Sequence, residues 1–295
     1  MKQLDYIIVG FGIAGLCFAE RLRQHNKSFV LYNQPPNIST AVSGGVINPT
    51  VLKRFTAAWE ADMFLKAAIP FYEQLEAYTS QKVIKSQRIL RILKGYEEQN
   101  NWMLASEKDG LKDFLVDSIQ KNVFSNVQAP FGMGEVQQGY QLFPKQLLNT
   151  YLEKLEGLQQ LQKEQFEYEQ LEFEKGQLRY KDIETQRIVF TEGVAAVNNP
   201  YFPSEALQAN KGEYIIFESK ELQLDAILKG GMMIIPLGDN LYKAGATFDR
   251  DNFSIQPTEN ASEEIQTKIR SMIGCDFKVI DQVAGIRPTV KDRKP

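Results

Sequence analysis

The scarcity of histidine and cysteine excludes several catalytic chemistries. The 295 residues include one histidine, His25, and two cysteines, Cys17 and Cys275, which lie far apart. Ser-His-Asp hydrolysis and histidine-rich metal centres need a buried, partnered histidine, whereas His25 stands in the polar stretch RQHNKS and is expected on the surface. The cysteine spacing fits neither a disulfide framework nor a zinc site and favours a reducing compartment. We therefore expect no metal site and a chemistry supplied by a cofactor.

The sequence also lacks a strong charge of either sign and a long apolar run. Its formal net charge is -3, so no broad basic surface is available for nucleic acid, although local basic patches are not excluded. No stretch approaches the length of a membrane span, and the N-terminal apolar run is too short for a signal peptide. We expect a cytoplasmic protein, and the sequence does not set its oligomeric state. The length suits one large domain or two interleaved domains.

The first 33 residues have the pattern of a βαβ unit. The run DYIIVG, residues 5–10, is a short apolar strand of the kind that is covered on both faces. Helical periodicity follows over residues 13–24, and SFVLYN, residues 28–33, predicts the second strand. A unit of this length and order is typical of a parallel sheet that binds a nucleotide.

A glycine fingerprint occupies the turn between this first strand and the helix. Gly10, Gly12 and Gly15 form G-x-G-x-x-G, with Ile13 and Ala14 as the residues that open the helix. Gly10 permits the tight turn, Gly12 lets the backbone approach a pyrophosphate, and Gly15 lets the helix pack close to the strand. The free N–H groups at the start of the helix attract the phosphates. Inside a βαβ unit the motif predicts a dinucleotide site.

The end of the second strand departs from the usual pattern. An Asp or Glu that binds the ribose is expected about 20 residues after the motif, and this chain has Asn33 there. A neutral amide offers one acceptor oxygen, which weakens the ribose contact by about 1 kcal/mol without excluding the ligand. No Arg or Lys follows in NQPPN, so a 2′-phosphate is disfavoured.

The remaining chain alternates between helical and extended patterns. Residues 55–78 predict a long helix with a kink at Pro70, residues 82–134 predict short antiparallel strands, and residues 143–161 predict another helix. Residues 213–248 predict a meander of antiparallel strands. This order indicates two domains woven together.

Several later segments carry a resemblance to one family. After the glycine motif come the small-residue loop TAVSGGVINP, the segments TEG and KGEYIIF, and the GAT strand of Gly245, Ala246 and Thr247. The chain ends on a G-x-R-P-x-x-x-D-x-x-P pattern made by Gly285, Arg287, Pro288, Asp292 and Pro295. This ordered set resembles the D-amino-acid oxidase superfamily of FAD enzymes, most closely its glycine-oxidase-like branch.

The resemblance implies the fold and its division. It is an α/β fold, in which a Rossmann-like FAD-binding domain is interleaved with an α+β substrate domain built on an antiparallel sheet. The FAD-binding domain is expected to comprise residues 1–80, 135–200 and 282–295. The substrate domain is expected to comprise residues 81–134 and 201–281. The family normally continues for a few dozen residues more, so a fragment is favoured over a shortened relative.

The resemblance also implies which residues contact FAD. The glycine motif would hold the pyrophosphate, Asn33 would face the adenosine ribose, and Phe166 would lie near the adenine. The flavin would lie along four small or apolar residues, Ser43, Gly44, Gly45 and Val46. Thr191 to Gly193 take the place of a small-residue strand end near the cofactor, where Glu192 is unusual.

The expected substrate site follows from the same resemblance. Arg287, placed after a strand that returns to the cofactor domain, would bind the substrate carboxylate through its guanidinium fork. The alternative is that Arg287 only braces the domain junction. Met233 and Phe248 would line the pocket, with plain core packing as the alternative for Met233 and its neighbour Met232.

The predicted function is oxidation of the C–N bond of an amino acid or related amine by hydride transfer to the flavin of FAD. Small-molecule amines are the expected partners, and nucleic acid is not expected. Two alternatives stay open: an enzyme like the oxidase that modifies the wobble uridine of tRNA, and a non-catalytic flavin-binding protein. The net charge of -3 argues against tRNA binding, whereas Asn33 and Glu192 keep the non-catalytic alternative open. Trp59 and Trp102 are expected to be packing residues.

Overall fold

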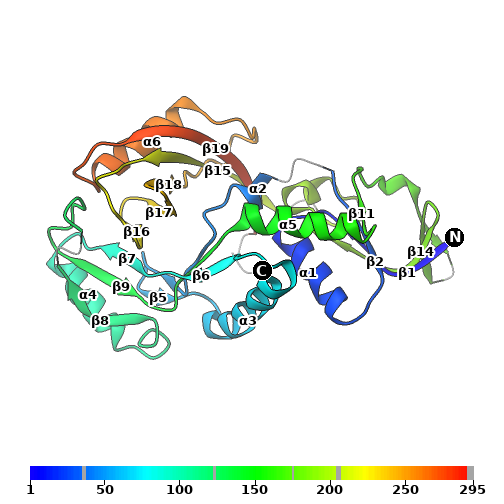
Figure 1. The fold of residues 1–295 in the computed structure, drawn as a ribbon, viewed down its shortest axis with the longest axis horizontal. Helices are drawn as coiled ribbons and strands as arrows, with labels where there is room; N and C mark the ends of the chain where they lie inside the picture. The colour runs from blue at the N-terminus through cyan, green and yellow to red at the C-terminus, as the bar shows by residue number, and fades with distance from the viewer. Residues whose placement is uncertain (35–37, 122–123, 175, 204–206, 291–295) are drawn as a thin grey trace.

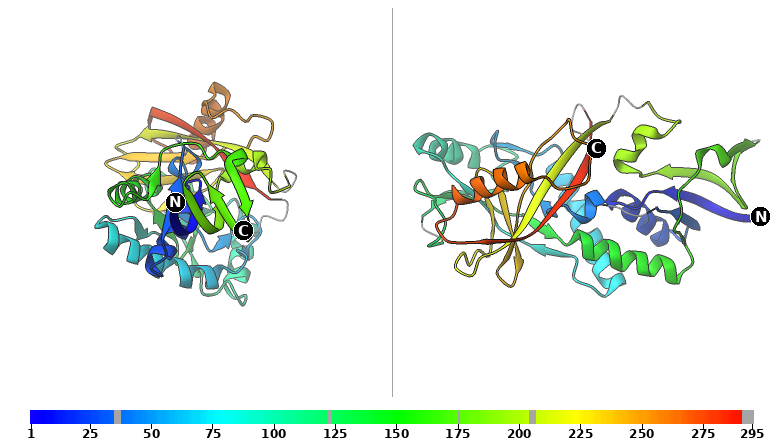
Figure 2. Two further views of the ribbon diagram at one scale, coloured as in Figure 1. Left: turned by 90° about the vertical axis from the view of Figure 1, so that its right-hand side faces the viewer. Right: turned by 90° about the horizontal axis from the view of Figure 1, so that it is seen from above.

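The computed structural model describes residues 1–34, 38–121, 124–174, 176–203 and 207–290. Figure 1 shows an elongated molecule with two halves along its long axis. One half contains the N-terminus and a six-stranded sheet, and the other contains an eight-stranded sheet. The chain crosses between the halves more than once, and the views in Figure 2 show this interleaving from the end and from above.

The six-stranded sheet has the order β11-β2-β1-β14-β13-β12. β1 pairs in parallel with β2 and with β14, and β2 pairs in parallel with β11. The carboxyl ends of these four parallel strands therefore meet at one edge of the sheet, where nucleotides bind in such folds. The strands are β1 (Lys2–Val9), β2 (Phe29–Tyr32), β11 (Leu161–Gln162), β12 (Leu171–Glu174), β13 (Gln177–Tyr180) and β14 (Ile183–Phe190).

Three helices cover this sheet and bury a common core with it. They are α1 (Ile13–Gln24), α3 (Ala61–Thr79) and α5 (Pro144–Gly157). Leu16, Leu75 and Leu147 come from the three helices and are fully buried against one another and the sheet. The predicted βαβ unit and the helices are confirmed. α3 starts later than predicted because the chain first forms β5 (Thr56–Ala57) and then turns through Glu60, whose φ of 51° is left-handed.

The eight-stranded sheet has the order β19-β15-β18-β17-β16-β7-β9-β8. The predicted meander over residues 213–248 is confirmed, because β15, β18, β17 and β16 pair antiparallel in that order. The strands are β7 (Ile89–Ile92), β8 (Leu115–Gln120), β9 (Met133–Val136), β15 (Gln208–Glu218), β16 (Ile227–Lys229), β17 (Met233–Gly238), β18 (Leu241–Gly245) and β19 (Lys278–Thr289).

Two helices of this half were not predicted. α6 (Glu259–Arg270) covers one face of the sheet, where Ile265 and Ile269 are fully buried in the core. α4 (Tyr96–Ser106) lies within the segment for which only short strands were predicted. Its polar residues mask the helical period. Trp102 and Ala105 are buried in the core, and the ring of Trp102 occupies the space that a side chain at Gly134 would take.

Short elements join the two halves. β10 pairs antiparallel with β3 and with β6 in a three-stranded sheet, and β4 pairs with β5. Two 3-10 turns lie beside the six-stranded sheet. These elements are α2 (Ile38–Ala41), β3 (Val46–Ile47), β4 (Thr50–Val51), β6 (Ile84–Ser86), β10 (Tyr140–Leu142), η1 (Tyr168–Gln170) and η2 (Gly193–Asn198).

The position of β19 differs from the expected one. β19 hydrogen-bonds to β15 along its whole length, so residues 278–289 belong to the eight-stranded sheet, whereas 282–295 had been assigned to the FAD-binding domain. Arg287 consequently lies within a strand rather than after it. The division into domains stays a prediction. Asp292 and Pro295 of the terminal motif lie outside the described residues.

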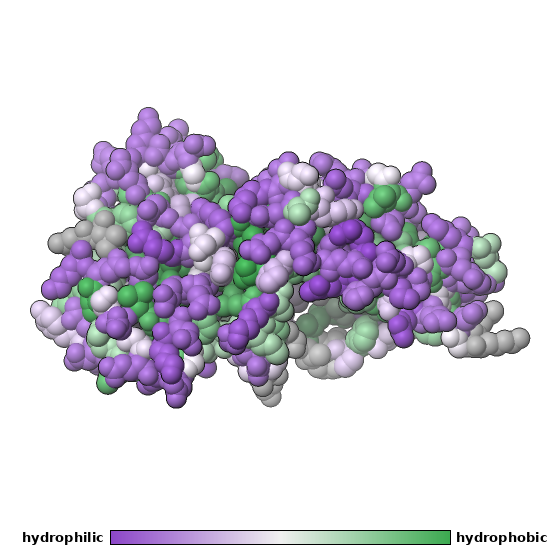
Figure 3. All heavy atoms as spheres, turned by 60° about the horizontal axis from the view of Figure 1, so that its bottom comes forward, coloured by the Kyte–Doolittle hydropathy of each residue, from purple (hydrophilic) through white to green (hydrophobic). Residues whose placement is uncertain are grey.

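The surface carries the residue types expected of it, with one correction. Hydrophilic side chains cover most of the face in Figure 3. His25 is exposed just after α1, as predicted. Trp102 is a packing residue, but the prediction for Trp59 is wrong, because its side chain is 50% exposed and packs on Phe64 at the start of α3. Among the helices of the described ranges, none is both long and apolar enough to cross a membrane.

Candidate functional site

The glycine turn after β1 leaves no room for side chains at two of its positions. Gly10 has a φ of +95°, and a Cβ there would lie 2.7 Å from the carbonyl oxygen of Thr191. A Cβ on Gly15 would lie 2.3 Å from the carbonyl oxygen of Gly10. Both obstacles are backbone atoms, which cannot rotate away. Gly10 and Gly15 therefore serve the tight turn and the close approach of α1 to the sheet.

The start of α1 has backbone N–H groups of the kind that bind an anion. Gly12 is the N-cap residue and supplies no side-chain cap, and the N–H of Ile13 donates a 3.2 Å hydrogen bond to Oγ1 of Thr40. Ala14 contributes the next backbone N–H of this first turn. The helix macrodipole and these N–H groups favour a phosphate at this position, which is the place expected for the cofactor pyrophosphate.

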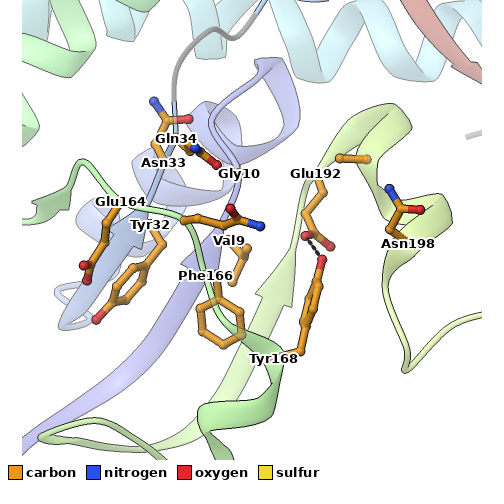
Figure 4. Close-up of a pocket in the computed structure, with 12 residues that line it drawn as sticks. Val9, Gly10, Tyr32, Asn33, Gln34, Glu164, Phe166, Tyr168, Glu192 and Asn198 are labelled. Carbon is orange, nitrogen blue, oxygen red and sulfur yellow. Dashed lines mark hydrogen bonds between the residues drawn. The ribbon is translucent and has the colours of Figure 1, made fainter. Parts of the chain in front are cut away.

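A pocket of about 220 Å³ opens beside this turn, at the carboxyl ends of β1, β2 and β14. In Figure 4, Asn33 and Glu164 lie on one side of it, Glu192 and Asn198 lie on the other, and the ring of Phe166 lies between them. The lining residues are Val9, Gly10, Tyr32, Asn33, Gln34, Glu164, Gln165, Phe166, Tyr168, Glu192, Ala195 and Asn198. The structure thus brings together the predicted residues Gly10, Asn33, Phe166 and Glu192, whereas Gly193 is exposed at the start of η2.

The walls of this pocket are fixed by aromatic packing. Phe166 is buried and stacks on Tyr180 at a centroid distance of 4.1 Å, and it meets Tyr32 edge to face at 5.7 Å. Asn33 is also buried, and its backbone N–H donates a 2.9 Å hydrogen bond to the carbonyl oxygen of Gln162. Apolar rings beside buried polar groups suit a flat heterocycle with a sugar attached.

The predicted flavin-side loop is packed tightly against both halves. Gly45 has a φ of +65°, and a Cβ there would lie 2.0 Å from the carbonyl oxygen of Leu142. A Cβ on Gly44 would lie 2.5 Å from Cδ1 of Ile235 on β17. Ser43 donates from Oγ to the carbonyl oxygen of Thr40 at 2.8 Å. Val46, the last of the four predicted residues, starts β3.

Lys243, which the sequence analysis did not single out, holds this loop to the eight-stranded sheet. Its Nζ donates to the carbonyl oxygens of Val42 and Ser43 at 2.7 and 3.1 Å. The side chain is largely buried and lies 5.0 Å from the ring of Tyr214. Burial, reinforced by the charge of Lys145, lowers the pKa of Lys243 to about 8, and the charge of Asp281 offsets this only in part.

This lowered pKa predicts a pH-dependent stability. The unfolded state holds the Lys243 proton up to its ordinary pKa of 10.5, whereas the folded state loses it near pH 8. Below pH 8 the buried ammonium of Lys243 lowers the stability of the folded state by its full amount. This destabilisation disappears as the pH rises from 8 to 10.5. The free energy of unfolding of wild type should therefore rise by about 2 kcal/mol between pH 8 and 10.5, and Lys243→Met should abolish this rise.

Urea unfolding of wild type and Lys243→Met at steps between pH 7 and 10.5 measures this effect. Lys220→Met is the matched control, because Lys220 is exposed and should leave the pH dependence of wild type unchanged. Parallel curves for wild type and Lys243→Met would show that Lys243 titrates as in water.

Arg287 lies on the face of the eight-stranded sheet that is turned toward the flavin-side loop. Its register partner is Asn210 on β15, and its guanidinium occupies the space beside Gly212, where a Cβ would lie 2.1 Å from one Nη atom. Tyr214 follows on the same face, since side chains alternate along a strand. Its hydroxyl lies 3.4 Å from a Cβ built on Gly44. The opposite face is the one covered by α6.

The guanidinium of Arg287 is lightly engaged. Its two terminal nitrogens each approach the carbonyl oxygen of Thr247 at 3.5 Å, which is the outer limit of a hydrogen bond. No ion pair of Arg287 is found among the residues that the structure describes. Gly212 was not singled out from the sequence, although Gly in a strand interior is a signal that another group approaches the backbone closely.

The two other predicted substrate residues lie in different environments. Met233 is half-buried on the same sheet face as Tyr214 and packs against the apolar cluster that contains Ile235. Met232 points to the other face, where it is buried in the core. Phe248 follows β18, and its side chain is 60% exposed. The role of each in substrate binding stays a prediction.

Comparison with known proteins identifies the family. The family described as "DAO: FAD dependent oxidoreductase" matches residues 5–295 of this chain. The chain belongs to this family. It is therefore an FAD-dependent oxidoreductase, which confirms the resemblance and the cofactor predicted from the sequence.

Solved structures share the fold at low sequence identity. L-proline dehydrogenase from P. horikoshii has a TM-score of 0.82 at 13% identity, over 100% of this chain and 84% of that one. Glycine oxidase from Geobacillus kaustophilus has a TM-score of 0.80 at 14% identity, over 100% and 85%. L-alpha-glycerophosphate oxidase from Mycoplasma pneumoniae, with FAD bound, has a TM-score of 0.72 at 16% identity, over 99% and 84%. The predicted fold class is confirmed. The names of these three proteins do not identify the substrate of this chain.

The residues of this FAD-dependent oxidoreductase fit their cofactor. The glycine turn is closed by backbone contacts, the start of α1 carries backbone N–H groups suited to a pyrophosphate, and the adjacent pocket has aromatic walls and buried polar groups. Gly10, Gly12, Ile13 and Ala14 would hold the phosphates. Within the described residues no group of three His, Cys, Asp or Glu side chains could hold a metal ion.

Proposed function

We propose that this FAD-dependent oxidoreductase oxidises the C–N bond of an amine or amino acid that carries a carboxylate. The observation that carries the proposal is the position of Arg287, on the sheet face that also presents Tyr214 and Met233 to the flavin-side loop. A guanidinium can bind a carboxylate through two parallel hydrogen bonds. The weak contacts of Arg287 with Thr247 leave this fork available.

A second polar group lies beside Arg287. Asn210 is its register partner on β15 and is buried, and its side-chain oxygen has no hydrogen-bond partner among the described residues. A buried acceptor without a partner costs free energy, so a donor on a ligand would relieve it. An amine substrate carries such a donor close to its carboxylate. Asn210 and Arg287 together would therefore suit an amino-acid head group.

The protein residues would bind and orient the substrate. Bound FAD supplies the acceptor for the two electrons and the hydrogen taken from the substrate carbon. Arg287 would fix the carboxylate, and Tyr214 and Met233 would limit how the amine carbon faces the flavin-side loop. Ile235 and Met233 exclude water from this face, because they belong to an apolar cluster. None of these roles requires a histidine.

Absorbance spectroscopy of the purified protein tests this function. We expect oxidised-flavin bands between 350 and 500 nm, and we expect anaerobic glycine, sarcosine, proline or a D-amino acid to bleach them. Glycerol 3-phosphate is the contrasting substrate, since one protein of similar fold is named for it. Bleaching by glycerol 3-phosphate but by none of the amines would overturn the proposal, and a flavin that no substrate bleaches would support the non-catalytic alternative.

A further inference from the structure

Two polar side chains line opposite sides of the pocket beside the glycine turn, and their identities are exchanged relative to the usual pattern. The end of β2 carries the neutral Asn33, where a carboxylate normally binds the ribose. A carboxylate stands instead on Glu192, just after β14, on the opposite wall (Figure 4). We propose that Glu192 binds the ribose hydroxyls of FAD in place of the carboxylate that position 33 lacks. The proposal rests on the FAD site described above and adds the residue that anchors its ribose.

The carboxylate of Glu192 is held in place by two donors. The hydroxyl of Tyr168 donates to Oε1, and Nδ2 of Asn199 donates to Oε2 at 2.7 Å. Asn199 is itself buried, and its Oδ1 accepts from the N–H of Tyr201 at 2.9 Å. A carboxylate offers about four acceptor positions. Two therefore remain for a ligand, on a group whose orientation is already fixed.

Tyr168 stays a donor at neutral pH. Burial is the main cause that raises the pKa of its phenol, and the hydrogen bond to Glu192 raises it further. Its ring packs against Phe166 at a centroid distance of 5.8 Å, and this contact favours the position in which the hydroxyl meets Glu192. The carboxylate thus needs no reorganisation when a ligand enters, which saves the entropy of ordering it.

The position of Glu192 selects the ribose rather than the adenine. Thr191 donates from Oγ1 to the carbonyl oxygen of Gly10 at 2.7 Å, and a Cβ on Gly10 would lie 3.0 Å from Cα of Glu192. Glu192 is therefore adjacent to the first glycine of the phosphate turn. The ribose is the part of the nucleotide joined directly to the pyrophosphate. The adenine lies one unit farther along, where the rings of Tyr32 and Phe166 form the wall.

Charge explains why only one of positions 33 and 192 carries a carboxylate. Carboxylates at both position 33 and position 192 would share a small pocket beside two phosphates and would repel each other and the ligand. Glu164 also lines the pocket, but its carboxylate is paired with Lys181 at 2.9 Å and is part of the solvent-facing rim. Glu263, which is exposed on α6 and lies outside this pocket, is the control for Glu192.

Nucleotide titration of the full chain freed of FAD tests the proposal. We expect Glu192→Gln to raise the Kd of FAD about tenfold, because the bonds to the ribose lose their charge, and Glu263→Gln to change it less than twofold. Asn33→Asp is expected to weaken binding in wild type. In the Glu192→Gln background, Asn33→Asp is expected to restore FAD binding, because it supplies a carboxylate at position 33 in place of the one lost at position 192.

ADP and two analogues identify the group that is bound. Replacing ADP with 2′-deoxy-ADP should raise the Kd by a factor several-fold larger in wild type than in Glu192→Gln. Replacing ADP with inosine diphosphate should raise the Kd by the same factor in both proteins. Each comparison is made within one protein, so a change in folding cancels. Equal 2′-deoxy penalties, or a Glu192→Gln protein that binds FAD like wild type, would overturn the ribose assignment. A wild-type protein that binds neither FAD nor ADP would overturn the cofactor site itself.

Discussion

Replacing Arg287 with alanine is expected to lower kcat/KM for carboxylate-bearing amines by about 30-fold to several thousandfold. This range corresponds to the 2–5 kcal/mol, roughly, that truncating one partner of a buried charge pair costs. Arg287→Lys should give an intermediate loss, because lysine keeps the charge but lacks the planar fork. FAD binding should be unchanged in both variants. Steady-state kinetics with the best amine of the bleaching test, together with FAD titration, measures these effects.

Gly212→Ala tests the same assignment without removing the guanidinium. Its Cβ would lie 2.1 Å from one Nη atom and 2.5 Å from Cζ of Arg287, and a flexible side chain yields more easily than the backbone. The guanidinium should therefore move by about 1 Å, which can cost up to about 100-fold in activity. Arg270→Ala, at an exposed position on α6, is the control and should be neutral. An Arg287→Ala enzyme with the KM of wild type would instead favour a bracing role at the domain junction.

Gly15→Ala is expected to damage both folding and cofactor binding. The new Cβ would lie 2.3 Å from the carbonyl oxygen of Gly10 and 2.7 Å from Oγ1 of Thr191. Relief of these contacts requires α1 to move away from β1, which should lower the free energy of unfolding by about 1–3 kcal/mol. The same movement displaces the N–H groups that face the pyrophosphate. The Kd of FAD should rise by about 5-fold to 150-fold, the range that corresponds to 1–3 kcal/mol.

Gly157→Ala is the matched control for Gly15→Ala. Gly157 is the last residue of α5, and a Cβ there meets no other atom within 4 Å. This variant should gain roughly 0.4–1 kcal/mol of stability from the stiffer unfolded chain and should bind FAD normally. Urea unfolding and flavin fluorescence titration of both variants give the comparison. Normal FAD binding by Gly15→Ala would show that α1 does not need its close approach to the sheet.

The parts of this protein that were predicted from sequence are the local ones. Residues 5–33 contain a strand, a glycine turn, a helix and a second strand in direct succession, so their pattern specified the phosphate site and the cofactor class. The meander over residues 213–248 was equally local, because each strand pairs with a neighbour close in the chain. Periods of two and near four residues report which face of an element is apolar. They do not report what that face meets.

Contacts between distant segments were decided by the tertiary structure alone. Lys243 meets the carbonyl oxygen of Val42 about 200 positions away, and Glu192 shares a pocket with Asn33 because β14 and β2 both flank β1. α4 was missed because its polar surface hides the helical period and only a few of its residues, chiefly Trp102 and Ala105, are buried in the core. The sequence by itself determined a dinucleotide site, through chemistry contained in a few adjacent residues, whereas FAD followed from the resemblance of later segments to the family. The structure decided which side chains surround that cofactor, because their meeting depends on how strands from distant parts of the chain pack together.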